Sequence, residues 1–194
     1  ILNMLFWKIK RLIDVGISLS GIILLAVPLF LIAMAIRLTS EGPAIYWSTR
    51  IGRNSQPFTM PKFRTMKITA PELPTHELTD SYLHITAVGK FLRKFSIDEL
   101  PQLYSVLIGE MSLVGPRPMI PKLTDIIEKR KINGVDKLRP GITGWAQVNG
   151  RDTLSTEQKL ALEVEYLENL SILFDIWILI LTVSHIFRPK DVAH

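Results

Sequence analysis

Two adjacent carboxylates, Asp98 and Glu99, stand at the start of a segment with leucines at helical spacing. Such a pair can divide the roles of nucleophile, metal ligand and proton carrier, and the positive end of a helix dipole favours the ionised carboxylate that a nucleophile needs. The alternative is ordinary helix capping, for which aspartate is a preferred residue. Because Pro101 has no N–H and belongs in the first helical turn, we expect the N-cap at Asp98 or later rather than at Ser96.

Four basic residues are candidates to surround these carboxylates together with a phosphate. Lys62 and Arg64 alternate with Phe63, so on a strand the two cations would share one face, suited to a diphosphate, while Phe63 points to the core. Arg93 lies just upstream of the carboxylates, and Arg117 is held in a rigid Gly-Pro-Arg-Pro turn. The alternatives are an exposed basic strand edge, a solvated face, or attraction to anionic lipid headgroups.

Composition narrows the cofactor and the partners. The chain of 194 residues has no cysteine and four histidines, which excludes a disulfide scaffold, a thiolate nucleophile and a Cys-ligated zinc site. A bound metal would therefore need oxygen ligands, which points to Mg²⁺ bridging a carboxylate and substrate phosphates. The net charge of +5 suits phosphates or anionic lipid. Aromatic residues are not interleaved with the basic ones, so we expect no nucleic-acid partner.

An uncharged hydrophobic run over residues 15–36 is long enough, as a helix, to cross the hydrocarbon core of a membrane. Basic residues flank both of its ends: Lys8, Lys10 and Arg11 before it, and Arg37, Arg50 and Arg53 after it. Both flanks favour the cytoplasmic side, and Pro28 near the middle favours a kink. We predict a re-entrant hairpin that is broken at Pro28, although an ordinary kinked transmembrane helix fits these residues equally well.

The remaining patterns predict an α+β fold that is mainly helical, with a small β element. The expected elements are short strands within 44–67, a surface loop over 70–80, a short helix over 122–131, a packing helix capped at Ser155, and an interfacial or buried helix over 176–187. In the helix after Ser155, the glutamates at 163, 165 and 168 are expected mostly off the packed face. We divide the chain into a membrane-embedded hairpin, 1–40, and a cytoplasmic domain with interfacial helices, 41–194, which form one continuous functional unit.

Five segments resemble the signature motifs of the monotopic phosphoglycosyl transferases, also called bacterial sugar transferases. They follow the family order along nearly the whole chain: RIG at 50–52, KFRTM at 62–66, RKFSIDELPQL at 93–103, GEMSLVGPRP at 109–118, and RPGITGWAQVNGR at 139–151. The resemblance implies transfer of a sugar phosphate from a UDP-sugar to polyprenol phosphate, usually undecaprenyl phosphate. The products would be a polyprenyl-diphosphate sugar and UMP, in the first membrane step of O-antigen, capsule, exopolysaccharide or glycoprotein glycan synthesis.

The resemblance also implies roles for individual residues. Asp98 would attack the β-phosphate, form a covalent phosphosugar intermediate and serve as an Mg²⁺ ligand, while Glu99 would support proton transfer or the metal environment. The implied contacts of the cations are Arg117 with the nucleotide-sugar, Lys62 and Arg64 with the donor phosphates, and Arg93 with the phosphate of the lipid. A metal and cations would neutralise charge that develops on the transferred phosphoryl group.

In its membrane segment the chain resembles the small form of the family, which consists of the catalytic domain alone. The resemblance implies a helix that re-enters at a proline, here Pro28, at the cytoplasmic face of the bacterial inner membrane, in contact with anionic or zwitterionic lipid. Many relatives have serine before that proline, whereas this chain has Val27, whose side chain has no hydroxyl for a freed carbonyl. The oligomeric state stays open, with a homo-oligomer among the options. The alternative function is a non-enzymatic peripheral membrane scaffold whose binding of anionic lipid is indifferent to Asp98.

Overall fold

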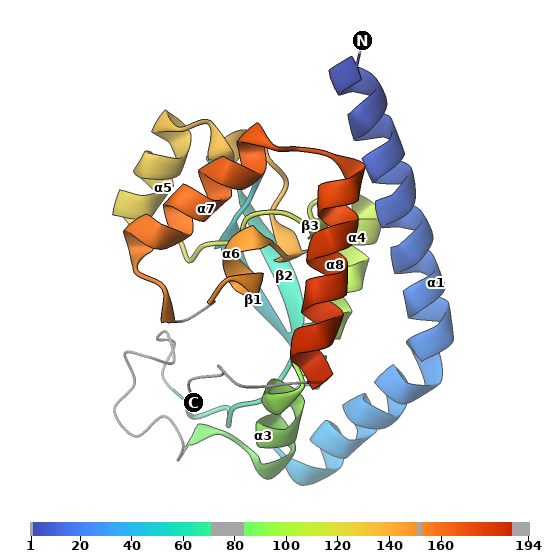
Figure 1. Ribbon diagram of the computed structural model, residues 1–194. Helices are drawn as coiled ribbons and strands as arrows, with labels where there is room; N and C mark the ends of the chain where they lie inside the picture. The colour runs from blue at the N-terminus through green and yellow to red at the C-terminus, as the bar shows by residue number, and fades with distance from the viewer. Residues whose placement is uncertain (1, 71–83, 151–152, 188–194) are drawn as a thin grey trace.

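Over the residues that the structure describes, the fold is mainly helical with two small sheets, which confirms the predicted class. The computed structural model describes residues 2–70, 84–150 and 153–187, so the loop predicted over 70–80 lies almost entirely outside the described residues. The elements are α1 (Leu2–Thr39), β1 (Ile45–Ile51), η1 (Arg53–Ser55), β2 (Pro57–Phe63), α3 (Ala87–Lys94), η3 (Ile97–Gln102), α4 (Leu103–Ile108), β3 (Ser112–Val114), α5 (Thr124–Ile132), η4 (Val135–Lys137), β4 (Gly141–Thr143), α6 (Trp145–Val148), α7 (Thr156–Glu168) and α8 (Ile172–Phe187). Figure 1 shows α1 along one side of the domain, beside α8 and α3.

The first helix, α1, is continuous through Pro28 and bends. Figure 1 shows its axis turning, in the C-terminal third, towards α3. Proline cannot donate a hydrogen bond to the carbonyl four residues earlier, and its ring clashes with that carbonyl, which accounts for the bend. One face of α1 packs on the domain, with Ile22 and Ile36 in two separate hydrophobic clusters. The predicted kink is therefore present, but the predicted break is not, because the helix continues through Pro28. Re-entrant insertion into a membrane stays a prediction.

The strands β1 and β2 form an antiparallel hairpin whose register places basic residues on one face. Arg50 pairs with Phe58, and Lys62 pairs with Tyr46. Residues directly opposite in an antiparallel pair share a face, and so do residues two apart on one strand. Arg50 and Lys62 therefore lie on the same face as Met60, which is buried and packs into the core. The strand β2 lies against η3, so this face points at the carboxylates.

Two hydrophobic clusters hold the segment that carries Asp98 and Glu99. The larger cluster contains Met60, Leu103, Val106, Met111, Leu113, Val114, Leu138, Val148, Tyr166 and Ile178, and the smaller one contains Ile36, Phe63 and Leu92. Ile97 packs against the smaller cluster, whereas Leu103 belongs to the larger one. The short η3 helix thus bridges the two clusters and is anchored at both ends. The burial of Phe63 confirms its predicted place in the core.

The start of the helix after the carboxylate pair differs from the prediction. Asp98 and Glu99 do lie in a first helical turn, but that turn belongs to the 3₁₀ helix η3, and the N-cap position is Ser96 rather than Asp98. Ser96 takes a left-handed conformation with φ of 54°, which starts the helix before the acidic pair. Pro101 is accommodated inside η3, where it omits one i→i+3 bond, and the α-helical geometry begins only at Leu103.

The C-terminal helices confirm two predictions and correct two. The helix α7 begins at a capping box formed by Ser155 and Gln158. The prediction that Glu163 lies off the packed face is wrong, because Glu163 is buried and pairs with Arg130 of α5. The helix α5 confirms the short helix expected over 122–131. The last helix, α8, starts at Ile172, earlier than the predicted 176, because Ser171 accepts a hydrogen bond from the N–H of Phe174.

Candidate active site

The carboxylate of Glu99 is buried beneath the β1–β2 hairpin and is held by cations from two other segments. Its Oε1 atom lies 2.8 Å from Nζ of Lys62 and 3.5 Å from Nη2 of Arg117. The Glu99 side chain is 11% exposed and that of Lys62 is 18% exposed, so water screens this ion pair weakly. The structure thus brings together three of the predicted site residues, from β2, η3 and the turn after β3.

Asp98 occupies the neighbouring, partly buried position in η3. Burial and the adjacent Glu99 carboxylate raise the pKa of Asp98, and Lys62 and Arg93 offset part of that rise. A carboxylate with little hydration at a site ringed by cations can attack an electrophile that carries negative charge of its own. The raised pKa works against the ionised form that a nucleophile needs, and Lys62 and Arg93 are the groups that favour it.

Arg93 approaches Asp98 from α3. Its Nε atom donates a 2.9 Å hydrogen bond to Oγ1 of Thr65, which fixes the guanidinium beside the carboxylate pair. Burial lowers the pKa of Arg93, and the charge of Asp98 acts in the opposite direction. The close packing of α3 against the chain at Thr65 depends on Gly89, since a Cβ at Gly89 would lie 2.1 Å from the Thr65 carbonyl oxygen. The structure therefore places Arg93 beside Asp98, while its contact with a lipid phosphate stays a prediction.

Arg50 is a member of the site that the sequence reasoning did not include among its site residues. Its Nε atom donates a 3.0 Å hydrogen bond to Oγ of Ser48 on the same strand face. Burial and the nearby Arg117 lower the pKa of Arg50, while Tyr46 and Glu99 act in the opposite direction. The available signal was the alternation along 46–50 combined with the strand pairing, which puts Arg50 on the face of Lys62.

Arg64 takes a different place from Lys62. The strand β2 ends at Phe63, so the alternation that would align the two cations does not extend to Arg64. The Arg64 guanidinium lies against Gly42, just beyond the end of α1: a Cβ at Gly42 would be 3.0 Å from Nη1 of Arg64. Gly42 also has φ of 91°, a conformation that suits glycine. Lys62 reaches Glu99, whereas Arg64 packs at the base of α1.

The acidic residues of the site fit a magnesium ion shared with substrate. Within the described residues, no group of three or more His, Asp and Glu side chains converges on a common point. Mg²⁺ commonly binds through one or two carboxylates together with substrate phosphates rather than through a full protein cage. Asp98 and Glu99 are the two carboxylates that could serve in this way, and they lie among cations suited to the same phosphates. Their oxygen donors therefore suit Mg²⁺ better than zinc.

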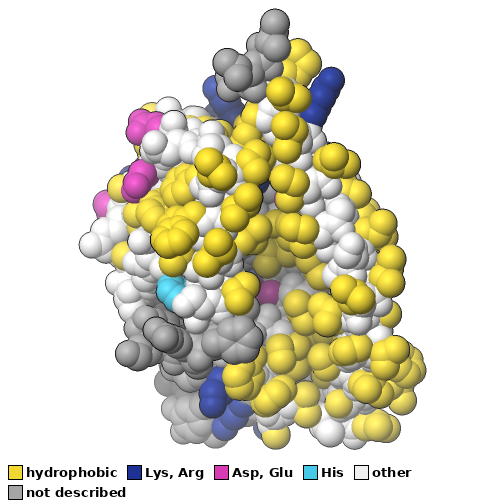
Figure 2. All heavy atoms as spheres, turned by 45° about the vertical axis from the view of Figure 1, so that its right-hand side comes forward, with side chains coloured by type: hydrophobic (Ala, Val, Ile, Leu, Met, Phe, Trp, Pro, Cys, Tyr) yellow, Lys and Arg dark blue, Asp and Glu magenta, His cyan; other side chains and the backbone are white. Residues whose placement is uncertain are grey.

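An extensive apolar surface lies next to this site, on α1 and α8. The segment Met4–Thr39 is, by length and composition, long and apolar enough to cross a membrane. Among the side chains of α8 that the structure describes, the exposed large apolar ones are Leu173, Ile176, Trp177, Ile180 and Val183. Figure 2 shows apolar side chains over both helices and, between them, a hollow with an acidic side chain at its base. Apolar patches of this extent mark surfaces that contact lipid or another protein.

The comparisons with known proteins identify the family of the chain. The family model described as bacterial sugar transferase matches residues 5–189. The chain is 39% identical over 191 residues to the UDP-glucose:undecaprenyl-phosphate glucose-1-phosphate transferase of Escherichia coli strain K12, covering 94% of this chain and 41% of that protein. It is 38% identical over 184 residues to the uncharacterized sugar transferase EpsL of Bacillus subtilis strain 168, covering 95% of this chain and 90% of that protein.

A further relative is the exopolysaccharide production protein ExoY of Rhizobium meliloti strain 1021, which is 35% identical over 191 residues, with 90% of this chain and 83% of that protein covered. The chain thus spans about two fifths of the E. coli relative but most of the Bacillus and Rhizobium relatives. The family model covers nearly all of the sequence, including each segment that forms the site. The chain therefore belongs to the bacterial sugar transferase family.

Proposed function

We propose that this protein transfers a sugar phosphate from a UDP-sugar to undecaprenyl phosphate, at the cytoplasmic face of a bacterial inner membrane. The observation that carries the proposal is the Asp98–Glu99 pair, anchored between two hydrophobic clusters, ringed by Lys62, Arg93 and Arg117, and adjacent to a lipid-type apolar surface. The printed names of relatives add the substrate class, since the E. coli protein is named for UDP-glucose and undecaprenyl phosphate.

The proposed reaction has two displacement steps at one phosphorus atom. A carboxylate oxygen of Asp98 attacks the β-phosphorus of the UDP-sugar, an acyl-phosphate bond forms, the bond to the bridging oxygen breaks, and UMP leaves. An oxygen of the lipid phosphate then attacks the same phosphorus, the acyl-phosphate bond breaks, and Asp98 returns as a carboxylate. The second step releases the polyprenyl-diphosphate sugar.

The cations have separate parts in this proposal. Lys62 and Arg50, on one face of the hairpin, would bind the donor phosphates, and Arg117 would contact the nucleotide-sugar. Arg93, beside Asp98, would bind the lipid phosphate, and Arg64 stays a predicted donor contact. Mg²⁺, held by Asp98 with Glu99 nearby, would neutralise charge on the departing UMP.

The apolar face of α1 and α8 supports a membrane location for the acceptor. A lipid phosphate lies at the level of the headgroups, so an enzyme that uses it benefits from helices buried at that boundary. The hollow between α1 and α8 opens on this face (Figure 2), which suits an acceptor that approaches from the membrane. We propose that α1 enters the bilayer and returns to the same face at Pro28.

The experiment that tests the function is UMP release from a panel of UDP-sugars, with and without undecaprenyl phosphate and Mg²⁺. Asp98→Asn is expected to lower turnover at least about a thousandfold, because a missing nucleophile removes the covalent route. The matched control is Asp125→Asn, which changes an exposed aspartate of α5 in the same way and is expected to retain activity. If folded wild-type protein releases no UMP from any donor yet binds anionic vesicles equally with and without Asp98, the scaffold function replaces this one.

A further inference from the structure

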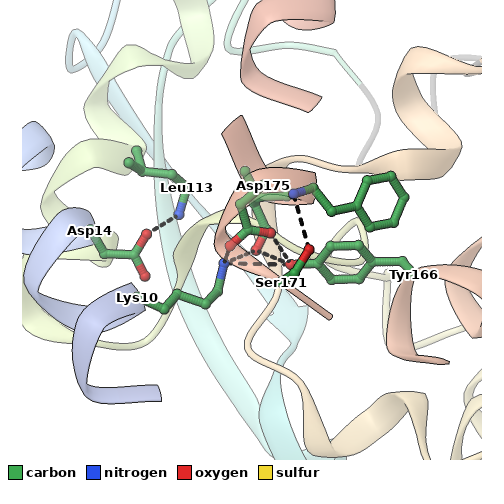
Figure 3. A network of polar contacts seen from close by, with 8 residues as sticks. Lys10, Asp14, Leu113, Tyr166, Ser171 and Asp175 are labelled. Carbon is green, nitrogen blue, oxygen red and sulfur yellow. Dashed lines mark hydrogen bonds and ion pairs between the residues drawn. The ribbon is translucent and has the colours of Figure 1, made fainter. Parts of the chain in front are cut away.

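A buried polar network joins the membrane helix to the short strand β3 (Figure 3). On α1, Nζ of Lys10 donates to Oδ2 of Asp175 at 2.6 Å and to the carbonyl of Val114 at 3.0 Å. One helical turn later, Oδ1 of Asp14 accepts a 3.0 Å hydrogen bond from the N–H of Leu113. Two charged side chains of α1 therefore bind backbone groups of two consecutive residues of β3, Leu113 and Val114.

These contacts are shielded from water. Lys10 is 7% exposed and Asp14 is 3% exposed. Tyr166 of α7 completes the network by donating a 2.6 Å hydrogen bond to Oδ1 of Asp175. Burying ionised groups is costly, so such pairs contribute modestly to net stability and are most useful for fixing one arrangement of the elements that they join. The network thus sets the position of α1 along β3.

The strand β3 needs these contacts because it has only one strand neighbour in the described structure. On one edge, the pairing with β4 includes a 2.9 Å bond from the N–H of Ser112 to the carbonyl of Pro140. The backbone groups of Leu113 and Val114 that bind α1 have side chains as partners in place of a second strand. Buried backbone groups require a partner, so α1 completes this small sheet.

The strand β3 leads directly into the turn that carries Arg117. At Gly115 the backbone is tightly packed, since a Cβ there would lie 2.4 Å from the carbonyl oxygen of Arg139. The next residue, Pro116, has a restricted φ, and its carbonyl accepts a 2.9 Å hydrogen bond from the N–H of Gly141. Because the chain between β3 and Arg117 is tightly packed and conformationally restricted, a displacement of β3 would also move Arg117. The guanidinium of Arg117 lies 3.5 Å from the Glu99 carboxylate.

We infer that Asp14 and Lys10 of the membrane helix are positioning residues for Arg117, and that they act by clamping β3. The docking of α1 then sets the geometry of the donor site, so that the helix which binds the membrane also completes the pocket. This inference rests on the proposed function, in which Arg117 contacts the UDP-sugar.

The test is a double-mutant cycle between Asp14 and Arg117, read as KM for the UDP-sugar and kcat. Asp14→Ala removes the acceptor for the Leu113 N–H and is expected to raise KM about tenfold with kcat changed less than about twofold. Asp14→Asn keeps a side-chain carbonyl oxygen and is expected to restore most of the affinity. In an Arg117→Ala background, Asp14→Ala is expected to raise KM hardly at all, because the contact of Arg117 with the UDP-sugar is already absent. The control is Lys8→Ala, at an exposed position of the same helix.

Hydrogen–deuterium exchange of the same variants, with no substrate present, separates this inference from the function. Asp14→Ala is expected to speed exchange across 113–117 while thermal unfolding stays cooperative, and Asp14→Asn is expected to leave it near the wild-type rate. The positioning role would be overturned if Asp14→Ala left hydrogen exchange unchanged. It would also be overturned if the double variant raised KM by the product of the effects of Asp14→Ala and Arg117→Ala. Wild-type protein without UMP release would refute the proposed function, and the exchange result would still decide whether α1 clamps β3.

Discussion

The buried ion pair between Arg130 of α5 and Glu163 of α7 allows a sharp prediction of stability. Nε of Arg130 lies 2.7 Å from Oε2 of Glu163, and Nη2 of Arg130 binds Oε1, so the guanidinium forms a two-pronged contact. The two side chains are 10% and 4% exposed. Replacing Arg130 by Met keeps most of the apolar stem but leaves the Glu163 carboxylate buried without its partner.

Breaking a buried pair on one side costs about 3–5 kcal/mol, most of which is the penalty for the remaining unpaired charge. For a chain of this length, 1 kcal/mol corresponds to a shift of roughly 2–4 °C in Tm, so Arg130→Met is expected to lower Tm by about 6–20 °C. Thermal unfolding in detergent micelles, followed by circular dichroism, measures the shift.

The double variant Arg130→Met/Glu163→Leu tests the reason for that loss. An apolar pair of similar volume removes both the attraction and the unpaired charge, so most of the stability is expected to return. Lys129→Met is the matched control: Lys129 neighbours Arg130 on α5, but its ion pair with Asp125 is exposed, and we expect an unchanged Tm. A Tm for Arg130→Met within about 2 °C of wild type, or a double variant as unstable as the single one, would refute the reasoning.

Three further predictions concern the candidate site and the helix α1. The pKa of Asp98 is raised in the folded state, so the stability that Asp98 contributes is fully present below the usual pKa range of Asp and is lost as the pH rises through the folded-state pKa. Without metal, Asp98→Asn is therefore expected to unfold at a higher Tm than wild type at pH 7. The difference in Tm is expected to close towards about pH 4. A lower Tm for Asp98→Asn at pH 7 would contradict this. Pro28→Ala is expected to straighten α1 so that the helix spans the bilayer and the N-terminus moves to the other face of the membrane. The chain has no cysteine, so a label on a single introduced cysteine, Lys8→Cys, reports on which face the N-terminus lies. Unchanged labelling would show that the bend at Pro28 does not determine the topology of α1. Gly89→Ala forces α3 away from Thr65 and is expected to lower the unfolding free energy by about 1–3 kcal/mol and to reduce turnover. Tm and UMP release measure the two effects. Wild-type values for both would show that the backbone near Thr65 can move to accommodate the added methyl group.

Local patterns in the sequence were sufficient wherever a few neighbouring residues decide the outcome. The capping box at Ser155 marked the start of α7, Pro28 marked the bend in α1, and the alternation around Phe63 predicted its burial. The acidic pair could be recognised from the sequence alone, because two adjacent carboxylates followed by leucines at helical spacing form a local pattern that does not depend on the fold. Even the error at its N-cap was small, since Ser96 and Asp98 compete for the same turn.

The partners of individual charges were decided only by the tertiary structure. Lys10 and Arg11 look in the sequence like a basic flank facing the cytoplasm, yet Lys10 is buried against Asp175 and Arg11 donates to the carbonyl of Val106, 95 residues away, at the end of α4. A charged side chain on a helix reads the same in sequence whether it is solvated or paired, because its burial depends on which distant element packs against it.

The same reason explains Arg50, Arg64 and Glu163. The register of β1 and β2 places Arg50 on the strand face that points at the acidic pair. The strand β2 ends at Phe63, and Arg64 packs instead against the end of α1. Helix packing turned Glu163 into an internal partner of Arg130. Sequence determined which chemistry this chain could carry and roughly where its elements begin, through short-range sterics and periodicity. Only the packing of segments far apart in the sequence decided which cations surround the carboxylates, because Coulomb interactions in a weakly hydrated site depend on distances that no local pattern encodes.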